Sequence, residues 1–420
     1  MEPIQASQNQ ARISHMLEQT ITMILAGGVG SRLKPLTEER AKPAVPFGGK
    51  YRIIDFTLAN CLHSGLRRIL VLTQYKSHSL QKHLRDGWSI FNPELGEYIT
   101  PVPPQMRSGE SWYAGTADAL YQNLYLLERS QATHALVLSG DHIYRMDYAA
   151  MLEFHRQRNA DVTIACMRTT LEQARAFGVM TADADRRIIG FAEKPSNPTP
   201  IPDDPEHALA SMGIYVFSME LLMSTLRDDH ERRDSSHDFG RDILPQLITD
   251  QRVYAYPFGT DAGRVTPDRY WRDVGTLDSY YDANMDLLEP VPGLNLYQDD
   301  WPIRTYQRQN APARTVPGES GNEGIFINSI VAEGTIIAGG HVQHSILFPN
   351  VYVGDEALLQ DAILFNGVHV SDRVQLRRCI IDKHVIIPPD MQIGYELEAD
   401  RRRFTVSENR IVVVPKGYRF

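Results

Sequence analysis

The sequence predicts an α/β domain with a Rossmann-like, mainly parallel sheet, followed by a C-terminal left-handed parallel β-helix. Three observations predict this. Short apolar runs alternate with helical segments over residues 21–218, the composition shifts to Pro, Gly, Asn and Gln after about residue 288, and small apolar residues then recur every five or six positions. A length of 420 residues also exceeds one ordinary domain. We therefore expect two domains and a connector.

The first domain is expected over residues 1–288, with residues 1–20 as an arm or short helix. Helical spacing marks residues 55–65 and 116–130. The expected strands are ITMILAGG (21–28), RRILVLTQY (67–75), HALVLSGDH (134–142), ADVTIACM (160–167) and GIYVFS (213–218). This alternation indicates right-handed βαβ units, which bind ligands at the carboxyl ends of their strands. Polar residues follow the strands there, at Gly27-Gly28, Thr73-Gln74 and Ser139–His142.

Residues 289–323 are interpreted as the connector, and residues 324–420 as the β-helix. A period near six fits neither a helix nor ordinary strand alternation, but it fits coils of very short parallel strands. A β-sandwich with scattered valines is the alternative. The expected inward series is Ile330, Ile336, Val342, Ile346, Val351, Ala357, Ile363, Val368, Val374, Ile380, Val385 and Met391.

Composition excludes several classes of protein. The net charge is −9, so we expect neither a nucleic-acid nor an anionic-membrane partner, because both need broad positive potential. Three cysteines, an odd number and far apart, predict no disulfide framework and a reducing cytoplasm. We find no apolar run of about 18 residues and no apolar signal core at the polar N-terminus.

Positive charge is instead concentrated behind a glycine turn, Gly27-Gly28-Val29-Gly30. The turn does not match a dinucleotide-binding fingerprint, because the third glycine is missing and Pro35 interrupts the helix that should follow. It does not match a Walker A loop either, because no G-K-[ST] follows. A tight turn with solvated cations remains an alternative. Cations this close repel one another unless an anion shares them, so the cluster favours a polyphosphate cradle. The basic residues are Arg32, Lys34, Arg40, Lys42, Lys50 and Arg52.

The segments LAGGVGSRLKPLT (25–37) and RAKPAVPFGGKYRIIDFTLANC (40–61) resemble the signature of sugar-nucleotide pyrophosphorylases, and most closely that of the ADP-glucose pyrophosphorylase family. The resemblance runs from residue 20 to the C-terminus. Further matches are SWYAGTADAL (111–120), SGDHIYRMDY (139–148), FGVM (177–180), FAEKP (191–195), ASMGIYVF (210–217), SSHDFGRDILP (235–245) and YWRDVGTLDSYYDANMDLL (270–288).

The resemblance implies the reaction of ATP with glucose 1-phosphate to give ADP-glucose and pyrophosphate, an allosterically regulated step that supplies glycogen synthesis. The attacking phosphate, with a second pKa of about 6, is largely dianionic at neutral pH, so no general base is required. Catalysis then consists of alignment and positive charge. By resemblance, Arg32 grips the departing phosphates, and Lys42 contacts phosphate or serves regulation, as Arg40 does.

Two aspartates, Asp141 and Asp273, match the metal-binding pair of the family, and Mg²⁺ suits two carboxylates together with phosphate oxygens. We interpret His142 as structural or as a partner of Asp141. The residues implied for glucose 1-phosphate are Tyr113, Gly178, Glu193, Lys194, Ser211, Tyr215, Asp238 and Trp271. Those implied for the nucleotide are Leu25, Gly27, Gly28, Gln74, Gly115 and Thr116.

Family members are homotetramers activated by glycolytic metabolites, which implies the same here. Glu39 stands where enteric-type relatives carry a lysine used for fructose bisphosphate, so fructose 6-phosphate or pyruvate is the expected kind of activator. Gln74 and Trp112 are the expected relay. The expected allosteric cleft between the domains is lined by Arg40, Lys42, Arg52, Asn328, Ser329 and Lys383.

Three alternative functions stay open at this point. The chain is a pyrophosphorylase for another nucleotide or sugar, a catalytically weak regulatory subunit, or an acyltransferase built on the β-helix. The acyltransferase reading depends on His341, His344, His369 and His384. The presence of Arg32, Lys42, Asp141, Lys194 and Asp273 favours an active enzyme.

Overall fold

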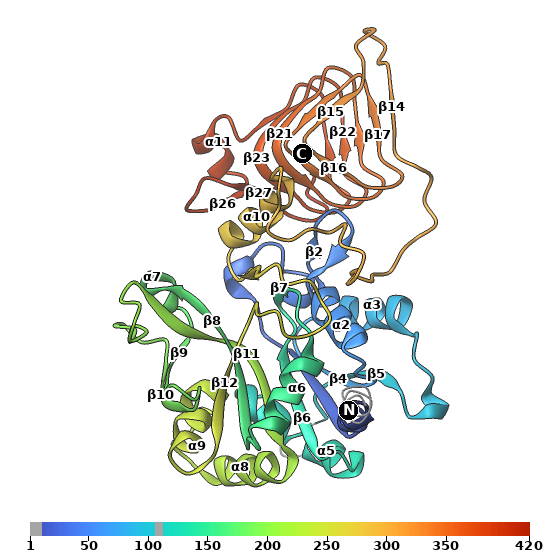
Figure 1. Cartoon of the computed structure of the whole chain (residues 1–420). Coiled ribbons are helices and arrows are strands. Elements are labelled where there is room, and N and C mark those ends of the chain that lie inside the picture. Colours follow the sequence, from blue (N-terminus) through green and yellow to red (C-terminus); the bar gives the residue numbers. More distant parts are fainter. Residues whose placement is uncertain (1–10, 106–111) are drawn as a thin grey trace.

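The computed structural model describes residues 11–105 and 112–420 and has the two predicted parts, with the β-helix standing on one end of the α/β domain (Figure 1). Residues 11–18 of the expected arm are helical and Thr20 already begins the first strand, while residues 1–10 lie outside the described residues. Ser111, the first residue of the SWYAGTADAL motif, lies outside them too. In the described part of the chain, no helix is both long enough and apolar enough to cross a membrane.

A mixed nine-stranded sheet forms the centre of the first domain. Its main path runs β10-β9-β11-β6-β1-β4-β5, while β8 pairs with β11 and β12. β1 pairs in parallel with β4 and β6, and β11 runs antiparallel to β6. The strands are β1 (Thr20–Ala26), β4 (Arg68–Thr73), β5 (Tyr98–Val102), β6 (His134–Ser139), β8 (Val162–Thr170), β9 (Gly178–Ala182), β10 (Ile188–Glu193), β11 (His207–Ser218) and β12 (Val253–Pro257). The parallel centre of the sheet was predicted, and the antiparallel β9, β10 and β11 build one flank of the site.

Helices cover both faces of this sheet, and some of them can be compared with the helical segments predicted from the sequence. α2 (Ile53–His63) agrees with the helix expected over 55–65. The single helix expected over 116–130 is two, α4 (Thr116–Tyr121) and α5 (Leu124–Ser130), because the Asn123 side chain donates to the Ala119 carbonyl at the break. The other helices are α3 (His78–Trp88), α6 (Tyr148–Gln157), α7 (Leu171–Ala174), α8 (Met219–Glu231), α9 (Leu244–Asp250) and α10 (Leu277–Met285).

Two small antiparallel ribbons complete the domain. β2 (Pro46–Phe47) pairs with β3 (Tyr51–Arg52) beside the β-helix. β7 (His142–Tyr144) pairs with β13 (Trp271–Asp273), so that Asp273 stands opposite His142 and Trp271 opposite Tyr144. This second ribbon brings two distant segments to one place.

The C-terminal domain is a parallel β-helix whose coils repeat every 16–17 residues, as in Ile346↔Ile363↔Ile380, and this rules out the β-sandwich alternative. β14 (Arg314–Val316) pairs with β17 (Ile336–Ala338), so the stack begins inside the segment expected as connector. Ile337 rather than Ile336 points inward, since only Ile337 is buried. The remaining strands are β15 (Ile325–Ile327), β16 (Ile330–Val331), β18 (His341–Gln343), β19 (Ile346–Leu347), β20 (Tyr352–Val353), β21 (Leu358–Leu364), β22 (His369–Val370), β23 (Gln375–Ile381), β24 (Ile386–Ile387), β25 (Gln392–Ile393), β26 (Thr405–Val406) and β27 (Val412–Val414), followed by the short helix α11 (Leu397–Arg401) between β25 and β26.

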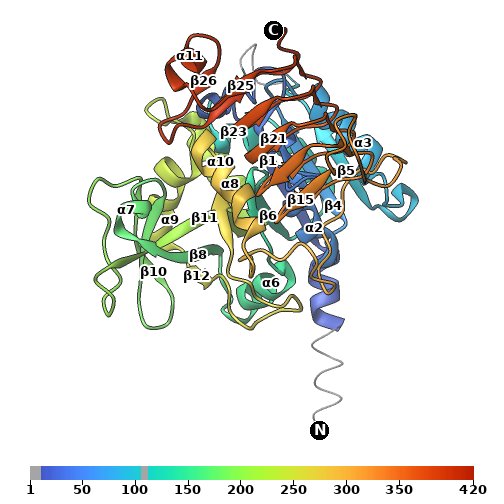
Figure 2. The ribbon, with the colours of Figure 1, turned by 90° about the horizontal axis from the view of Figure 1, so that it is seen from above.

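The two domains share one hydrophobic core. Phe348 and Phe365 of the β-helix belong to the same buried cluster as Phe47 and Leu287 of the first domain. α10 lies under the coils in both views (Figures 1 and 2), and the Tyr281 hydroxyl donates to the Asp361 carbonyl at 2.7 Å. The β-helix is therefore fixed to the α/β domain rather than tethered by the connector alone.

Candidate active site

The glycine turn follows β1 and opens onto a cavity of about 200 Å³. Gly30 has φ +62°, a left-handed conformation that favours glycine, and its carbonyl accepts the Thr37 hydroxyl at 2.8 Å. Gly28 faces open space, because an added Cβ there would meet nothing within 4 Å. The turn thus leaves room for a ligand to approach its backbone closely, as the predicted phosphate cradle requires.

Arg32 lies on the one-turn helix η1 (Ser31–Leu33) and lines the same cavity. Its guanidinium reaches toward Gly275, where an added Cβ would stand 3.1 Å from Nη2 and 3.0 Å from an Asp273 carboxylate oxygen. A side chain at Gly275 would occupy this space. Arg32 is exposed and so free to meet an anionic ligand.

Lys42, on η2 (Lys42–Ala44), joins the two predicted metal-binding aspartates. Its Nζ donates to Asp141 Oδ2 and to Asp273 Oδ1, each at 2.9 Å. The Lys42 side chain is 9% exposed, and those of Asp141 and Asp273 are 29% and 26% exposed. Lys42 therefore lies in the carboxylate pair and not in the cleft between the domains.

The charges of this cluster stabilise one another. Burial alone would lower the Lys42 pKa, but Asp141 and Asp273 outweigh it and raise that pKa. Burial opposes ionisation of Asp141 as well, yet Lys42 and the Ser139 hydroxyl hold the pKa of Asp141 well below its usual range. Both groups consequently stay charged at neutral pH.

The donor set suits a hard divalent cation. Asp141 and Asp273 come within reach of one ammonium and so of one metal ion, and such ions take one or two carboxylates plus phosphate oxygens. Over residues 11–105 and 112–420, no cluster of three or more His, Cys, Asp or Glu has metal-binding geometry. Burial lowers the pKa of His142, which stands 3.5 Å from Asp141 and packs against Trp271 with the two rings tilted by 59°.

A second polar cluster lies on the antiparallel flank of the sheet. Glu193 ends β10 opposite Gly178 of β9, and Lys194 follows with φ +46°. The Lys194 Nζ lies 3.1 Å from Glu193 Oε1, and the Lys194 side chain is 64% exposed. Added Cβ atoms at Gly178 and Gly240 would approach Glu193 Oε2 to 3.0 Å and 2.4 Å, so both glycines make room for this carboxylate.

The remaining residues predicted for the sugar surround Glu193. Glu193 and Asp238 both contribute, after burial, to a raised Tyr215 pKa, and Tyr215 also interacts with Ser211. Asp238 caps the turn at Phe239–Ile243, accepting from the Gly240 and Arg241 amides. Trp271 packs on Phe177, and its buried Nε1 has no hydrogen-bond partner among the described residues.

The residues predicted for the nucleotide form a third group. The Gln74 side chain lies against Gly27, and its Nε2 donates to the Tyr113 carbonyl at 3.5 Å. The Tyr113 hydroxyl accepts from Asn123, and Thr116 donates to Asp238. Gly115 packs so closely that an added Cβ would lie 2.2 Å from the His237 carbonyl. Trp112 is 55% exposed and directly precedes Tyr113, so the contact of Gln74 with the Tyr113 carbonyl brings the two residues of the expected relay near each other.

Cations from both domains meet at the domain boundary. Arg40 is buried, pairs with Asp382 at 3.0 Å and leaves Nη1 without a partner among the described residues. Burial lowers the pKa of Arg52 to about 10, and burial beside Arg52 and Arg40 lowers the pKa of Lys383 to about 7. We call Arg40, Arg52 and Lys383 the boundary cluster.

The other two residues predicted for the cleft lie on the first β-helix coil. Asn328 and Ser329 stand beside Ile330, which packs against Gly49, and Ser329 bonds within the coil to Ile327. Among the residues that the structure describes, no hydrogen bond or ion pair joins Asn328 or Ser329 to the boundary cluster. The four β-helix histidines likewise do not converge: His344 pairs with Asp361, and His369 stacks on Tyr352.

Sequence reasoning missed several residues that shape these sites. Ser139 donates to Asp141, and Gly240 and Gly275 supply space around Glu193 and Arg32. Glu39, singled out for its difference from relatives, forms an ion pair with Lys416 across the domain boundary. Only the Ser139 contact had a local signal, the position of Ser139 at a strand end.

A glycine turn after a parallel strand, a carboxylate pair and a separate Glu193–Lys194 ion pair fit the class of nucleotidyltransferases. Residues 21–290 match a family model of nucleotidyl transferases, and residues 311–414 match one of GlmU-like C-terminal hexapeptide repeats, consistent with a left-handed β-helix. The chain is 64% identical over 404 residues (96% of this chain, 99% of the relative) to glucose-1-phosphate adenylyltransferase 2 of Vibrio cholerae. It is 51% identical to glucose-1-phosphate adenylyltransferase of Rhodopirellula baltica (96% of this chain, 91% of the relative). The chain belongs to the glucose-1-phosphate adenylyltransferase family.

Proposed function

We propose that this chain transfers the adenylyl group of ATP to glucose 1-phosphate, releases pyrophosphate and supplies ADP-glucose for glycogen synthesis in the cytoplasm. The observation that carries the proposal is that two separate groups of positively charged side chains, one with Arg32 and Lys42 and one with Lys194, are connected through packed aromatic residues. The Lys194 amide donates to Phe177, Phe177 packs on Trp271, and Trp271 packs on His142 beside Asp141. One phosphorylated substrate at each site would place their phosphates near the carboxylate pair.

The chemistry needs no proton transfer. A phosphate oxygen of glucose 1-phosphate attacks the α-phosphorus of ATP; the new oxygen–phosphorus bond forms as the bond to the β-phosphate bridging oxygen breaks. Pyrophosphate carries away the electron pair. Arg32 and the glycine-turn amides bind the β- and γ-phosphates, and Lys194 binds the sugar phosphate. Glu193 accepts from sugar hydroxyls, and Trp271 Nε1, which has no partner among the described residues, has a hydrogen to donate.

Asp141 and Asp273 are the residues that would hold Mg²⁺. The bound ion would neutralise phosphate charge and align the triphosphate. Lys42 supports this role by donating to both carboxylates, which holds them close together in the absence of substrates. We therefore assign Lys42 to the catalytic centre, and Arg40, Arg52 and Lys383 to regulation.

A pyrophosphate-release assay with glucose 1-phosphate and ATP, UTP, TTP or GTP tests the proposal. We expect ATP to be the preferred nucleotide and release to require a divalent cation. Preference for another nucleotide would assign a different sugar-nucleotide product. No release with any of the four nucleotides would favour a regulatory subunit.

Regulation by a small anion is supported by the boundary cluster, which gathers three cations from both domains, one of them Arg40 in its pair with Asp382. Since Glu39 adds negative charge there, we propose fructose 6-phosphate or pyruvate as activators rather than a bisphosphate. Rates measured with a panel of metabolites test this choice. A best response to fructose 1,6-bisphosphate would contradict it.

Assembly into a homotetramer is supported by the free edge of the β-helix. β15 is the end strand of its sheet, and Ile325, Phe326 and Ile327 are 43%, 48% and 51% exposed. Exposed apolar strand edges favour pairing with another chain. Sedimentation should therefore reveal four 47.6 kDa chains, whereas a monomer would overturn the proposal.

A further inference from the structure

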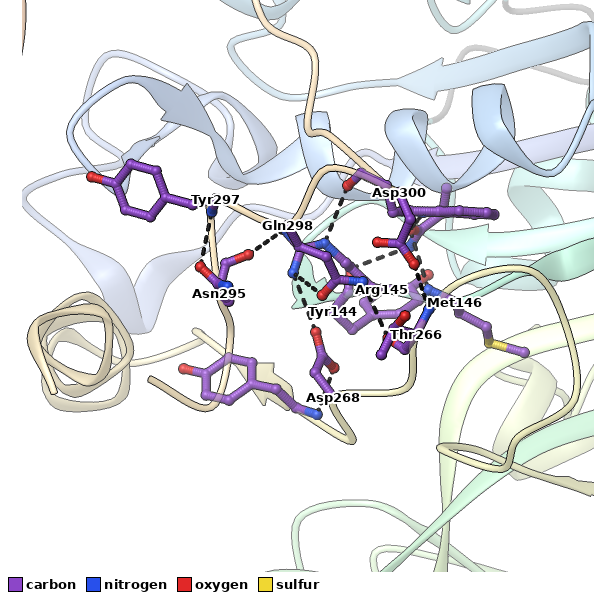
Figure 3. A network of polar contacts seen from close by, with 12 residues as sticks. Tyr144, Arg145, Met146, Thr266, Asp268, Asn295, Tyr297, Gln298 and Asp300 are labelled. Atoms are coloured by element: carbon purple, nitrogen blue, oxygen red, sulfur yellow. Dashed lines mark hydrogen bonds and ion pairs between the residues drawn. The ribbon is translucent and has the colours of Figure 1, made fainter. Parts of the chain in front are cut away.

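Arg145 is a buried cation that none of the predicted sites uses. It directly follows β7, and its side chain is 1% exposed. Figure 3 shows its guanidinium surrounded by acceptors from two other segments. Nη1 lies 3.4 Å from Asp268 Oδ2 and 3.3 Å from Gln298 Oε1, Nη2 donates to the Asn295 carbonyl at 2.7 Å, and Nε donates to the Trp301 carbonyl at 3.3 Å.

Asp268 connects Arg145 to β13, the other strand of the ribbon. Its Oδ1 accepts from the Tyr270 amide at 2.9 Å, and Tyr270 directly precedes β13. Arg145 and Asp268 therefore close one end of the β7–β13 ribbon, beyond the Tyr144–Trp271 pair. Asp141 and Asp273 lie at the other end, beside the His142–Asp273 pair.

Asn60 of α2 holds the same end of β7 from the opposite side. Its fully buried side chain donates to the Tyr144 carbonyl at 3.2 Å and accepts from the Met146 amide at 3.2 Å. It also accepts from Trp301 Nε1 at 2.9 Å. The connector is tied in further by Gln298, which donates to the Thr266 carbonyl. The ribbon end is thus fixed by side chains from a helix, a loop and the connector.

We propose that Arg145 is a positioning residue that sets the separation of Asp141 and Asp273 at which a divalent cation binds with the nucleotide. Arg145 is four residues from Asp141, which corresponds to roughly 13 Å along a strand. Because this distance separates Arg145 from the reacting phosphates, its effect has to pass through the ribbon. A planar guanidinium can bridge three chain segments at fixed angles, which a lysine ammonium cannot. A buried charge is also unfavourable unless hydrogen bonds and ion pairs satisfy all of it. Loss of one acceptor of Arg145 is therefore expected to disturb this end of the β7–β13 ribbon. This inference rests on the proposed function.

Binding of Mn²⁺, measured by electron paramagnetic resonance of the free ion, tests it without turnover. The protein is titrated with and without ATP and in the absence of glucose 1-phosphate. The variants are Arg145→Gln and Asp268→Asn, the second of which keeps the bond to Tyr270 and needs no cavity. Arg252→Gln is the matched control, since it removes an exposed two-pronged ion pair with Asp161 elsewhere in the domain.

In both Arg145→Gln and Asp268→Asn we expect Mn²⁺ affinity to fall at least tenfold and the Mg²⁺ concentration for half-maximal rate to rise in parallel. The KM for glucose 1-phosphate should change less than twofold, and Arg252→Gln should bind Mn²⁺ like the parent. Parental Mn²⁺ affinity in folded Arg145→Gln, or in Asp268→Asn if the former does not fold, overturns the inference. The parent protein could instead prefer another nucleotide and still lose Mn²⁺ affinity in the two variants. That result would support the role of Arg145 while refuting the proposed function.

Discussion

Lys42 shows how one residue prepares a site for two anions and a metal ion. An ammonium between two partly exposed carboxylates holds them close together and keeps Asp141 ionised, and each carboxylate raises the lysine pKa in return. The same geometry leaves Arg32 unpaired by any of these acids and open to solvent over the cavity. The residue nearest the open turn is therefore the one with charge available for phosphate.

Replacing Arg32 by alanine should cut kcat at least a hundredfold, equivalent to about 3 kcal/mol of transition-state stabilisation, because a cation on the leaving phosphates is lost. Steady-state rates and circular dichroism test this. Lys34→Ala, an exposed cation two positions along, should stay within about twofold of the parent. A comparable loss in both variants would mean that general positive charge, rather than Arg32, is responsible.

Lys194→Ala should act differently, mainly raising the apparent KM for glucose 1-phosphate. Lys194 is exposed and contacts only Glu193 through its side chain among the described residues, so its charge is available to the sugar phosphate. Lys82→Ala, at an exposed lysine paired with Asp86, is the control. If Lys194→Ala changed only the KM for ATP, the two phosphate sites would be assigned the wrong way round.

At the scale of elements, the β9–β10 hairpin determines where Glu193 and Lys194 stand. Gly178 lies opposite Glu193, and an added Cβ would come within 2.4 Å of the Phe191 ring. Gly190, in the same hairpin, has only Thr181 at 3.5 Å from an added Cβ. The hairpin therefore offers one crowded and one roomy glycine on neighbouring strands.

Gly178→Ala should raise the KM for glucose 1-phosphate about tenfold or more, because the methyl group displaces Phe191 and the Glu193 carboxylate. Initial rates with each substrate varied in turn provide the measurement. Gly190→Ala is expected to leave both KM values near those of the parent. Equal effects from the two substitutions would point to general loss of hairpin stability.

At the scale of the whole molecule, the shared core and the boundary cluster make the two domains one unit. Apolar residues of both domains form one buried cluster, while Arg40, Arg52 and Lys383 are held close together beside it. Packing thus outweighs the repulsion between these cations. An anion bound there would relieve that repulsion, which gives it a physical reason to stabilise this domain arrangement.

Stability should depend on pH through Lys383. Its folded pKa of about 7 lies below that of an unfolded lysine, so its charge destabilises the fold fully below pH 7. That penalty diminishes as pH rises from about 7 to about 10. Lys383→Met should accordingly raise the melting temperature more at about pH 6.5 than at about pH 9.5.

Thermal melts of the parent and of Lys383→Met at both pH values, with and without fructose 6-phosphate, test this prediction. The ligand should raise the melting temperature of the parent and have little effect on the variant. Lys416→Met, which removes a half-exposed lysine paired with Glu39, serves as the control and should lack the pH-dependent gain. A lower melting temperature for Lys383→Met at the acidic pH would contradict the buried-cation account.

Local patterns allowed much of the architecture to be predicted. Periodicity identified β1, β4, β6 and α2, and the six-residue repeat identified the β-helix, because backbone geometry and one-sided burial act over a few residues. The same patterns misplaced the start of the coil stack and four inward residues, because the β-helix core contains Ile337, Leu347, Leu364 and Ile381 instead of Ile336, Ile346, Ile363 and Ile380. The errors at inward positions are shifts of one residue, and the early start of the stack is seen only in the pairing of β14 with β17. Both depend on a neighbouring coil that is adjacent only in space.

By itself, the sequence determined the order of the elements, the glycine turn and the list of charged residues available for phosphates and metal. Only the tertiary structure decided that Lys42 meets Asp141 and Asp273, which are 99 and 231 positions away, and that Arg145 closes the ribbon behind them. The reason is physical. Local conformation depends on adjacent residues, whereas the partner of a charge depends on which distant segments the shared core packs together.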